Sequence, residues 1–268
     1  MLLGKEEKIV LLFDLHEENA ITWDMPSSSS SSPMKRFEVV SQVLESTIRR
    51  KTNFPYTHKF ALVAFRSSRA QDMKLIQNFT SDLSEMINAL ANLRQLFYAL
   101  PASPEEKGNG PLNSPVEGSV DLSELLYNLN SIFGSELREP LIENEYLTRC
   151  ILVYGRSTFV PKISKGIELI KNPQFYVDIL YIHLKPSADD DSMRCQEAYD
   201  ALAQIQAFMN EAGKISYVFE TFHSMMRLTT YCSMLIAHPA QRCDQEEMMV
   251  KVDISDVCIE EMKGTLLQ

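Results

Sequence analysis

Several runs of apolar residues in this sequence contain no alternating polar positions. The first covers residues 8–15 and places a carboxylate, Asp14, at its end. Runs of this kind are typical of strands covered on both faces, as in the middle of a parallel sheet. The pattern predicts strands at residues 8–15, 60–65, 150–154, 175–183 and 215–222. A weaker run at 73–79 follows a polar turn and predicts a hairpin at one edge of the sheet.

Between these runs, apolar residues recur at helical spacing. Helices are predicted at residues 35–53, 80–96, 121–133, 163–170, 193–212 and 224–237. Thr80 or Ser81 is expected to cap the second helix, with Glu85 reaching back to the cap. Gly134 is expected to end the third helix. This alternation predicts an α/β fold, a doubly wound, mostly parallel sheet with helices on both faces and one antiparallel edge strand.

Two low-complexity stretches interrupt the pattern. Residues 24–34 contain a serine run, and residues 101–120 are rich in Pro, Gly, Ser and Asn, so both are expected to be exposed loops. The predicted domain covers residues 1–237. Residues 238–268 form a tail in which 248–254 alternate as a strand would, without a nearby hairpin partner. Since a lone strand gains little by itself, the tail is expected to dock on another surface.

Composition narrows the classes of function. The chain has 268 residues, 45% of them hydrophobic, enough for one large core. Its net charge of −10 and scattered basic residues argue against direct nucleic-acid binding, which needs clustered Lys and Arg. The five cysteines form no C-x-x-C pair, which indicates a reducing compartment without disulfides or a zinc knuckle. Apolar runs are too short for a membrane span, so a soluble, unsecreted protein is expected.

Common cofactor and catalytic motifs are missing. A nucleotide site needs a glycine-rich turn after the first strand, but Asp14 is followed by Leu-His-Glu-Glu. The serine-hydrolase elbow G-x-S-x-G is also missing, and its nearest imitation at residues 155–159 lacks the second glycine. We therefore expect no cofactor and no enzymatic activity.

The end of the first strand resembles a cation site in altered form. In von Willebrand factor A domains, a strand ends in D-x-S-x-S, and the carboxylate and hydroxyl oxygens bind a hard cation. Here the pattern is Asp14-x-His16-x-Glu18, and a later strand ends in Tyr-Gly-Arg156 where that class supplies an acid. Arg156 could neutralise Asp14 in place of the ion. The sequence therefore predicts a degenerate site, and the alternative is a cation-dependent ligand-binding domain that uses Asp14.

Two histidines at predicted strand ends suggest a further alternative. His16 and His183 could approach Asp14 and form a zinc or acid–base trio. The simpler interpretation is that each histidine bonds to loop backbone at its strand end. We favour the simpler interpretation, because a working zinc site usually takes three protein ligands and the sequence offers no additional ligand signal.

Three segments together point to a family. They are Cys150-Ile-Leu-Val-Tyr-Gly-Arg156, Tyr176-Val-Asp-Ile-Leu-Tyr-Ile-His183 and Leu235-Ile-Ala-His-Pro-Ala-Gln-Arg242. In order and spacing they resemble the family of BRISC and BRCA-one-A complex member one, also known as MERIT-forty. The resemblance covers residues 8 to about 242. It implies a von Willebrand A-like domain without a functional cation site, in agreement with the altered pattern at Asp14.

The resemblance also implies a scaffold role. Members of this family hold together deubiquitinases that cut lysine-63-linked polyubiquitin, in the DNA damage response and in ubiquitin signalling, in cytoplasm and nucleus. The implied direct partner is a BRE-type subunit built from ubiquitin-conjugase-variant domains. An Abraxas-type scaffold and a JAMM-type zinc deubiquitinase belong to the same complex. A Pro-x-x-Arg segment that engages the BRE-type subunit maps onto residues 239–242, so the expected partner contacts are His238, Pro239, Arg242, Met248, Val250 and Val252.

Overall fold

The computed structural model describes residues 6–23, 34–54, 57–99, 120–134, 137, 146–186, 193–222 and 224–249. These residues build one six-stranded sheet with the strand order β3-β2-β1-β4-β5-β6. The strands are β1 (Glu6–Asp14), β2 (Lys59–Phe65), β3 (Met73–Thr80), β4 (Tyr146–Tyr154), β5 (Phe175–Ile182) and β6 (Val218–Thr221). The predicted loop at 24–34 and insertion at 101–120 lie almost entirely outside the described residues.

Strand pairing confirms the predicted fold class. β1 pairs in parallel with both β2 and β4, β4 with β5, and β5 with β6, whereas β3 runs antiparallel to β2 at one edge. The order reverses between β1 and β4, so the chain winds outwards in both directions from the centre. In doubly wound sheets, the crevice at such a switch point lies at the carboxyl ends of the strands and is where ligands bind.

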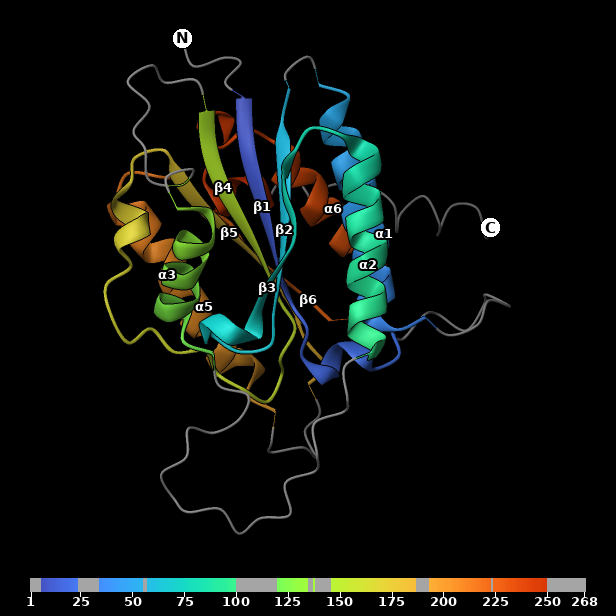
Figure 1. Ribbon diagram of the computed structural model, residues 1–268. Coiled ribbons are helices and arrows are strands. Elements are labelled where there is room, and N and C mark those ends of the chain that lie inside the picture. The colour runs from blue at the N-terminus through green and yellow to red at the C-terminus, as the bar shows by residue number, and fades with distance from the viewer. Residues whose placement is uncertain are drawn as a thin grey trace, which may run out of the picture.

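Helices cover both faces of the sheet (Figure 1). One face carries α1 (Arg36–Thr52), α2 (Leu83–Ala99) and α6 (Met225–Ile236), and the other carries α3 (Leu122–Phe133) and α5 (Cys195–Glu211). Short 3-10 helices complete the layers: η1 (Glu17–Ala20), η2 (Ala70–Asp72), η3 (Glu168–Lys171) and η4 (Pro239–Gln241). Because both faces are covered, alternate residues of β1 enter two separate cores. Ile9 and Phe13 pack on the α1 side, and Val10 and Leu12 on the α3 side.

The structure corrects two local predictions. Residues 163–170 do not form a helix, because the main chain of Lys162 pairs with Val120 and Leu122, and only η3 remains helical. The α2 helix is capped by Asp82 and not by Thr80 or Ser81. The Asp82 carboxylate accepts hydrogen bonds from the main-chain N–H groups of the first turn.

The chain beyond α6 continues along the domain. The predicted boundary at residue 237 coincides with the end of α6, but residues 238–249 contact β5 and β6, as detailed below. Residues 245–249 are helical, so Met248 does not lie in the predicted strand. Val250, Val252 and the rest of the tail to residue 268 lie outside the described residues. Within the described part, each helix is too short or too polar to cross a membrane.

Candidate functional site

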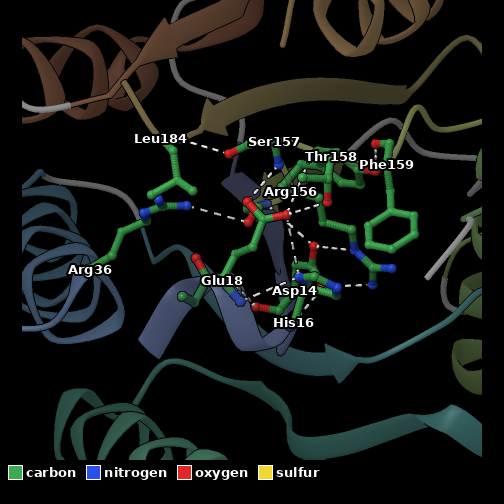
Figure 2. Close-up of polar contacts among 12 residues, drawn as sticks. Asp14, His16, Glu18, Arg36, Arg156, Ser157, Thr158, Phe159 and Leu184 are labelled. Atoms are coloured by element: carbon green, nitrogen blue, oxygen red, sulfur yellow. Dashed lines mark hydrogen bonds and ion pairs between the residues drawn. The ribbon is translucent and has the colours of Figure 1, made fainter. Parts of the chain in front are cut away.

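The carboxyl edge of the central strands holds the residues of the predicted degenerate cation site (Figure 2). Asp14 is the last residue of β1 and is fully buried between β2 and β4. The loop after β4 supplies Arg156, which is also fully buried. These positions come together because parallel strands end at the same edge of the sheet.

Arg156 binds both carboxylate oxygens of Asp14. Its Nε lies 2.8 Å from Oδ2 and its Nη2 lies 2.8 Å from Oδ1, a bidentate pair. The same Nη2 donates to the carbonyl of Arg66 at 2.6 Å, and the main chain of Gly155 and His16 also donates to the carboxylate. A guanidinium therefore contacts both oxygens of the carboxylate that a cation-binding domain would offer to its ion.

The Asp14 carboxylate stabilises the charged form of Arg156. Burial alone disfavours the charged guanidinium, but the Asp14 carboxylate outweighs this effect and raises the pKa of Arg156 above its ordinary value. The ring centroids of Tyr154 and Phe65 lie 5.8 Å and 6.0 Å from the guanidinium carbon, within the range of cation–π contacts. A cation would have to displace a permanently charged and enclosed side chain.

Glu18 and His16 are engaged by the surrounding loops. The Glu18 carboxylate accepts from the main-chain N–H of Ser157 at 2.7 Å and from the Thr158 hydroxyl at 2.9 Å. His16 caps η1, its Nδ1 accepting from the N–H of Glu18 at 3.4 Å. Burial, followed by the charge of Arg156, lowers the pKa of His16 below its ordinary value. The hydrogen bonds of Glu18 thus hold the loop after β1 against the loop after β4.

Gly155 permits the close approach of these loops. A Cβ atom at this position would lie 2.3 Å from the Asn19 side-chain oxygen. Asn19 cannot easily move, because it is buried and its Nδ2 donates to the Asp14 carbonyl at 3.0 Å. On the opposite side, Arg36 donates to the Gly155 and Ile182 carbonyls at 3.4 and 3.3 Å.

His183 does not join His16 and Asp14 in a trio. Its Nε2 lies 2.8 Å from the Glu220 carboxylate and its Nδ1 lies 2.6 Å from the Leu184 carbonyl. Within the described ranges, no three His, Cys, Asp or Glu side chains gather as metal ligands would. The zinc or acid–base alternative for these residues is therefore wrong, and the strand-end interpretation describes His183.

A second buried charge cluster lies toward the amino ends of the strands. Glu7 pairs with Lys51 and, at 3.0 Å, with Arg149. Arg149 in turn lies 3.7 Å from Asp178, which forms a bidentate pair with Arg242 at 2.6 and 3.0 Å. All five side chains are at most 5% exposed. They link β1, α1, β4, β5 and the chain after α6.

This cluster stabilises the end of α6. The last carbonyls of a helix have no partners within the helix. Here Lys51 donates to Ile236 at 2.8 Å, and Arg149 donates to Leu235 at 2.7 Å and to Ala237 at 3.2 Å. The apolar pattern did not reveal this arrangement. A signal was available, because Arg149 and Asp178 place charges inside strands that are otherwise mostly apolar.

The structure gives Arg242 a partner other than the one expected. Its guanidinium is buried against Asp178 and lies 4.5 Å from the Tyr217 ring centroid, so it does not reach the molecular surface. Pro239 and His238 are buried beside it. The guanidinium is thus bound within the chain, and direct contact of Arg242 with a partner protein stays a prediction. In this chain Arg242 holds residues 238–249 on the domain.

Two histidines are expected to change stability with pH in opposite directions. Burial opposes the charge of His183, but hydrogen bonds with Cys195 and Glu220 raise its pKa to about 9. Its favourable contribution is complete below the ordinary value of 6.5 and is lost as the pH rises through about 9. Burial, followed by the charge of Lys51, lowers the pKa of His58 to about 4. The stability that His58 contributes as a neutral, buried ring is present above pH 6.5 and is lost as the pH falls through about 4.

NMR titration of the ring protons of the full chain measures both histidines, with His183→Gln and His58→Gln used for assignment. His183 is expected to titrate near pH 9 and His58 near pH 4. Titration of His183 near pH 6.5 would contradict its charged pairing with Glu220.

Comparison with known proteins supports the family resemblance. No protein-family model matches the sequence. The rat (Rattus norvegicus) protein named BRISC and BRCA1-A complex member 1 is 24% identical over 245 residues, covering 88% of this chain and 64% of the relative. The chain thus spans less than two thirds of that relative's length. The resemblance seen in the sequence motifs is confirmed.

The solved structures similar to this chain have low sequence identity to it. The VWA domain of SpRpn10 has a TM-score of 0.46 at 16% identity, covering 84% of this chain and 93% of that domain. The PilB minor pilin of Streptococcus sanguinis has a TM-score of 0.47 at 11% identity, covering 88% of this chain and 61% of the pilin. Both scores are below 0.5, and the fold assignment rests on the strand order and pairing described above.

Proposed function

We propose that this chain is a non-catalytic scaffold subunit of a lysine-63-specific deubiquitinase assembly of the BRISC or BRCA1-A type. The main support for this proposal is the 24% identity, along 88% of this chain, to a rat protein named as a member of those complexes. The pair between Asp14 and Arg156 supports a scaffold, because it uses the edge residues for internal bonding. The alternative of a cation-dependent ligand binder would require an ion at a carboxylate that Arg156 already neutralises.

The proposed partners follow from the same resemblance. A BRE-type subunit would bind the chain directly, and an Abraxas-type scaffold and a JAMM-type zinc deubiquitinase would complete the assembly. The zinc chemistry would belong to the JAMM-type subunit. The proposed settings are the DNA damage response and ubiquitin signalling, in cytoplasm and nucleus.

Residues 238–249 are the proposed partner-binding segment. Arg242 anchors this segment to Asp178, while Gln241, Glu246 and Glu247 are exposed and Met248 is partly buried. A pre-ordered segment binds with a smaller entropy cost than a disordered one. Arg242 would therefore act by positioning the segment, and the contacts would come from its outer side chains.

Co-expression of the full chain with a BRE-type subunit, followed by size-exclusion chromatography, tests the proposal. The two proteins are expected to co-elute, and Gln241→Asp, at an exposed position of the segment, is expected to weaken affinity about tenfold by placing a charge in the interface. Tyr127→Asp is the matched control, because Tyr127 is 65% exposed on α3 and lies outside the proposed segment. Failure of the unaltered pair to co-elute at micromolar concentration would overturn the proposal.

Arg242→Ala separates positioning from direct contact. A positioning role predicts that affinity and the hydrogen-exchange protection of residues 241–249 fall together. Reduced affinity with unchanged protection would instead place Arg242 in direct contact with the partner.

A further inference from the structure

The outer edge of β6 carries main-chain groups that face away from the sheet. The main-chain N–H groups of Ile179, in β5, and His183, just after it, donate to the carbonyls of Tyr217 and Thr221 on the inner side of β6. Successive residues of a strand direct their main-chain N–H and C=O groups to opposite sides. Since Tyr217 and Thr221 face β5, Val218 and Glu220 direct theirs to the open side. Consistent with this, the Gln245 side-chain amide accepts from Val218 N and donates to Val218 O, each at 2.8 Å. An amide already occupies the position of a next strand at Val218.

A cavity of about 300 Å³ continues along this edge beyond Gln245. It lies where α5, α6 and residues 245–249 meet around β6. Its lining includes Tyr199, Glu220, Thr221, Arg227, Tyr231 and Met249. The aromatic and methionine side chains offer apolar surface beside the outward-facing main chain of Glu220. This combination suits an extended peptide, which needs main-chain pairing and pockets for alternate side chains.

The end of the cavity at α6 favours an anionic group. Ser224 caps this twelve-residue helix, and its first turn has no acidic side chain to complement the helix dipole. Arg227 is exposed in the same turn. Independently, Thr221 is only 3% exposed and its hydroxyl has no hydrogen-bond partner among the described residues. The nearby Glu220 carboxylate is balanced by His183 at 2.8 Å.

We propose that the β6 edge binds an extended segment of a partner protein as an additional strand, with an acidic side chain of that segment directed to Arg227 and the start of α6. The segment's main chain would pair with Glu220. Its apolar side chains would contact Tyr199 and Met249. This inference goes beyond the proposed function and does not depend on it.

Fluorescence polarisation with the full chain provides the test. The probe is a labelled nine-residue peptide of alternating valine and aspartate, and the matched probe carries lysine in place of aspartate. The acidic peptide is expected to bind with a dissociation constant of about 100 μM or tighter, and the lysine peptide about tenfold more weakly. Equal binding of the two peptides, or no binding of the acidic one, would overturn the proposal.

Two pairs of variants locate the binding. Arg227→Ala is expected to weaken the acidic peptide about tenfold, whereas Arg69→Ala, an exposed arginine in the turn between β2 and β3, should have no effect. Glu220→Pro removes the outward N–H of the edge strand, while Glu220→Ala keeps it and equally removes the carboxylate. Loss of binding in the proline variant alone is expected, with thermal unfolding used to verify that both variants fold.

Two outcomes would place binding elsewhere and overturn the proposal. The first is an equal loss in Arg227→Ala and Arg69→Ala. The second is binding that appears only when Val250 and Val252 are both changed to lysine in the full chain, because the chain's own carboxyl-terminal residues would then be the occupant.

Discussion

Arg156→Ala is expected to lower the free energy of unfolding by about 3–5 kcal/mol, the usual cost of leaving one member of a buried ion pair without its partner. Asp14 would remain fully buried with a negative charge and only the main-chain donors of Gly155 and His16. The Arg66 carbonyl would also lose a donor. Urea denaturation at pH 7 measures the change.

Arg49→Ala is the matched control for this prediction. Arg49 pairs with Glu45 on the surface of α1, where its side chain is 49% exposed, and its loss should cost less than about 0.5 kcal/mol. The double variant Asp14→Ala with Arg156→Ala should cost less than the sum of the single variants by about 1 kcal/mol or more. Equal costs for Arg156→Ala and Arg49→Ala would show that the pair is not buried in solution.

Arg156 is also expected to prevent cation binding at Asp14. Titration of the unaltered chain with MnCl₂ in a calorimeter is expected to give no binding heat, because Arg156 neutralises Asp14. A site of about millimolar affinity or tighter, the weak end of known extracellular calcium modules, would favour the cation-dependent alternative. Binding of Mn²⁺ in Arg156→Ala alone would instead show that the arginine stands in for the ion.

Asp178→Ala is expected to lower the free energy of unfolding by a similar amount, about 3–5 kcal/mol. The change would leave two buried guanidinium groups, Arg149 and Arg242, without the carboxylate between them. Tyr217 would also lose the acceptor of its main-chain N–H, which lies 3.0 Å from Asp178 Oδ1. Urea denaturation gives the total cost, and hydrogen exchange shows whether residues 241–249 lose protection first.

Glu168→Ala is the control for Asp178. Glu168 pairs with Lys171, but the side chains are 79% and 72% exposed, so the loss should be less than about 0.5 kcal/mol. Retained protection of residues 241–249 in Asp178→Ala would contradict the conclusion that the Arg242 pair holds this segment on the domain.

Local sequence pattern was sufficient for most of the architecture. The central strands have covered faces, so their apolar runs are continuous and mark them clearly, as in β1 and β5. The α3 helix shows its own boundaries, with Asp121 accepting from the first turn and Gly134 at a φ of 55° after the last. The helix predicted at residues 163–170 was wrong, because the conformation of this segment depends on pairing of Lys162 with the chain before α3.

Sequence alone determined the fold class, the altered pattern at Asp14, His16 and Glu18, and the resemblance to a family. Each is built from short patterns whose residues are close in the chain, taken in their order along it. Tertiary structure decided which charges meet. The pair between Asp14 and Arg156, 142 positions apart, was predicted from their places at two strand ends and is confirmed. The pair between Asp178 and Arg242, 64 positions apart, was not predicted. Whether an arginine reaches a partner protein or a buried carboxylate of its own chain depends on its burial and the acceptors around it. Those are properties of the packed sheet and helices, and the spacing of residues in the sequence does not contain them.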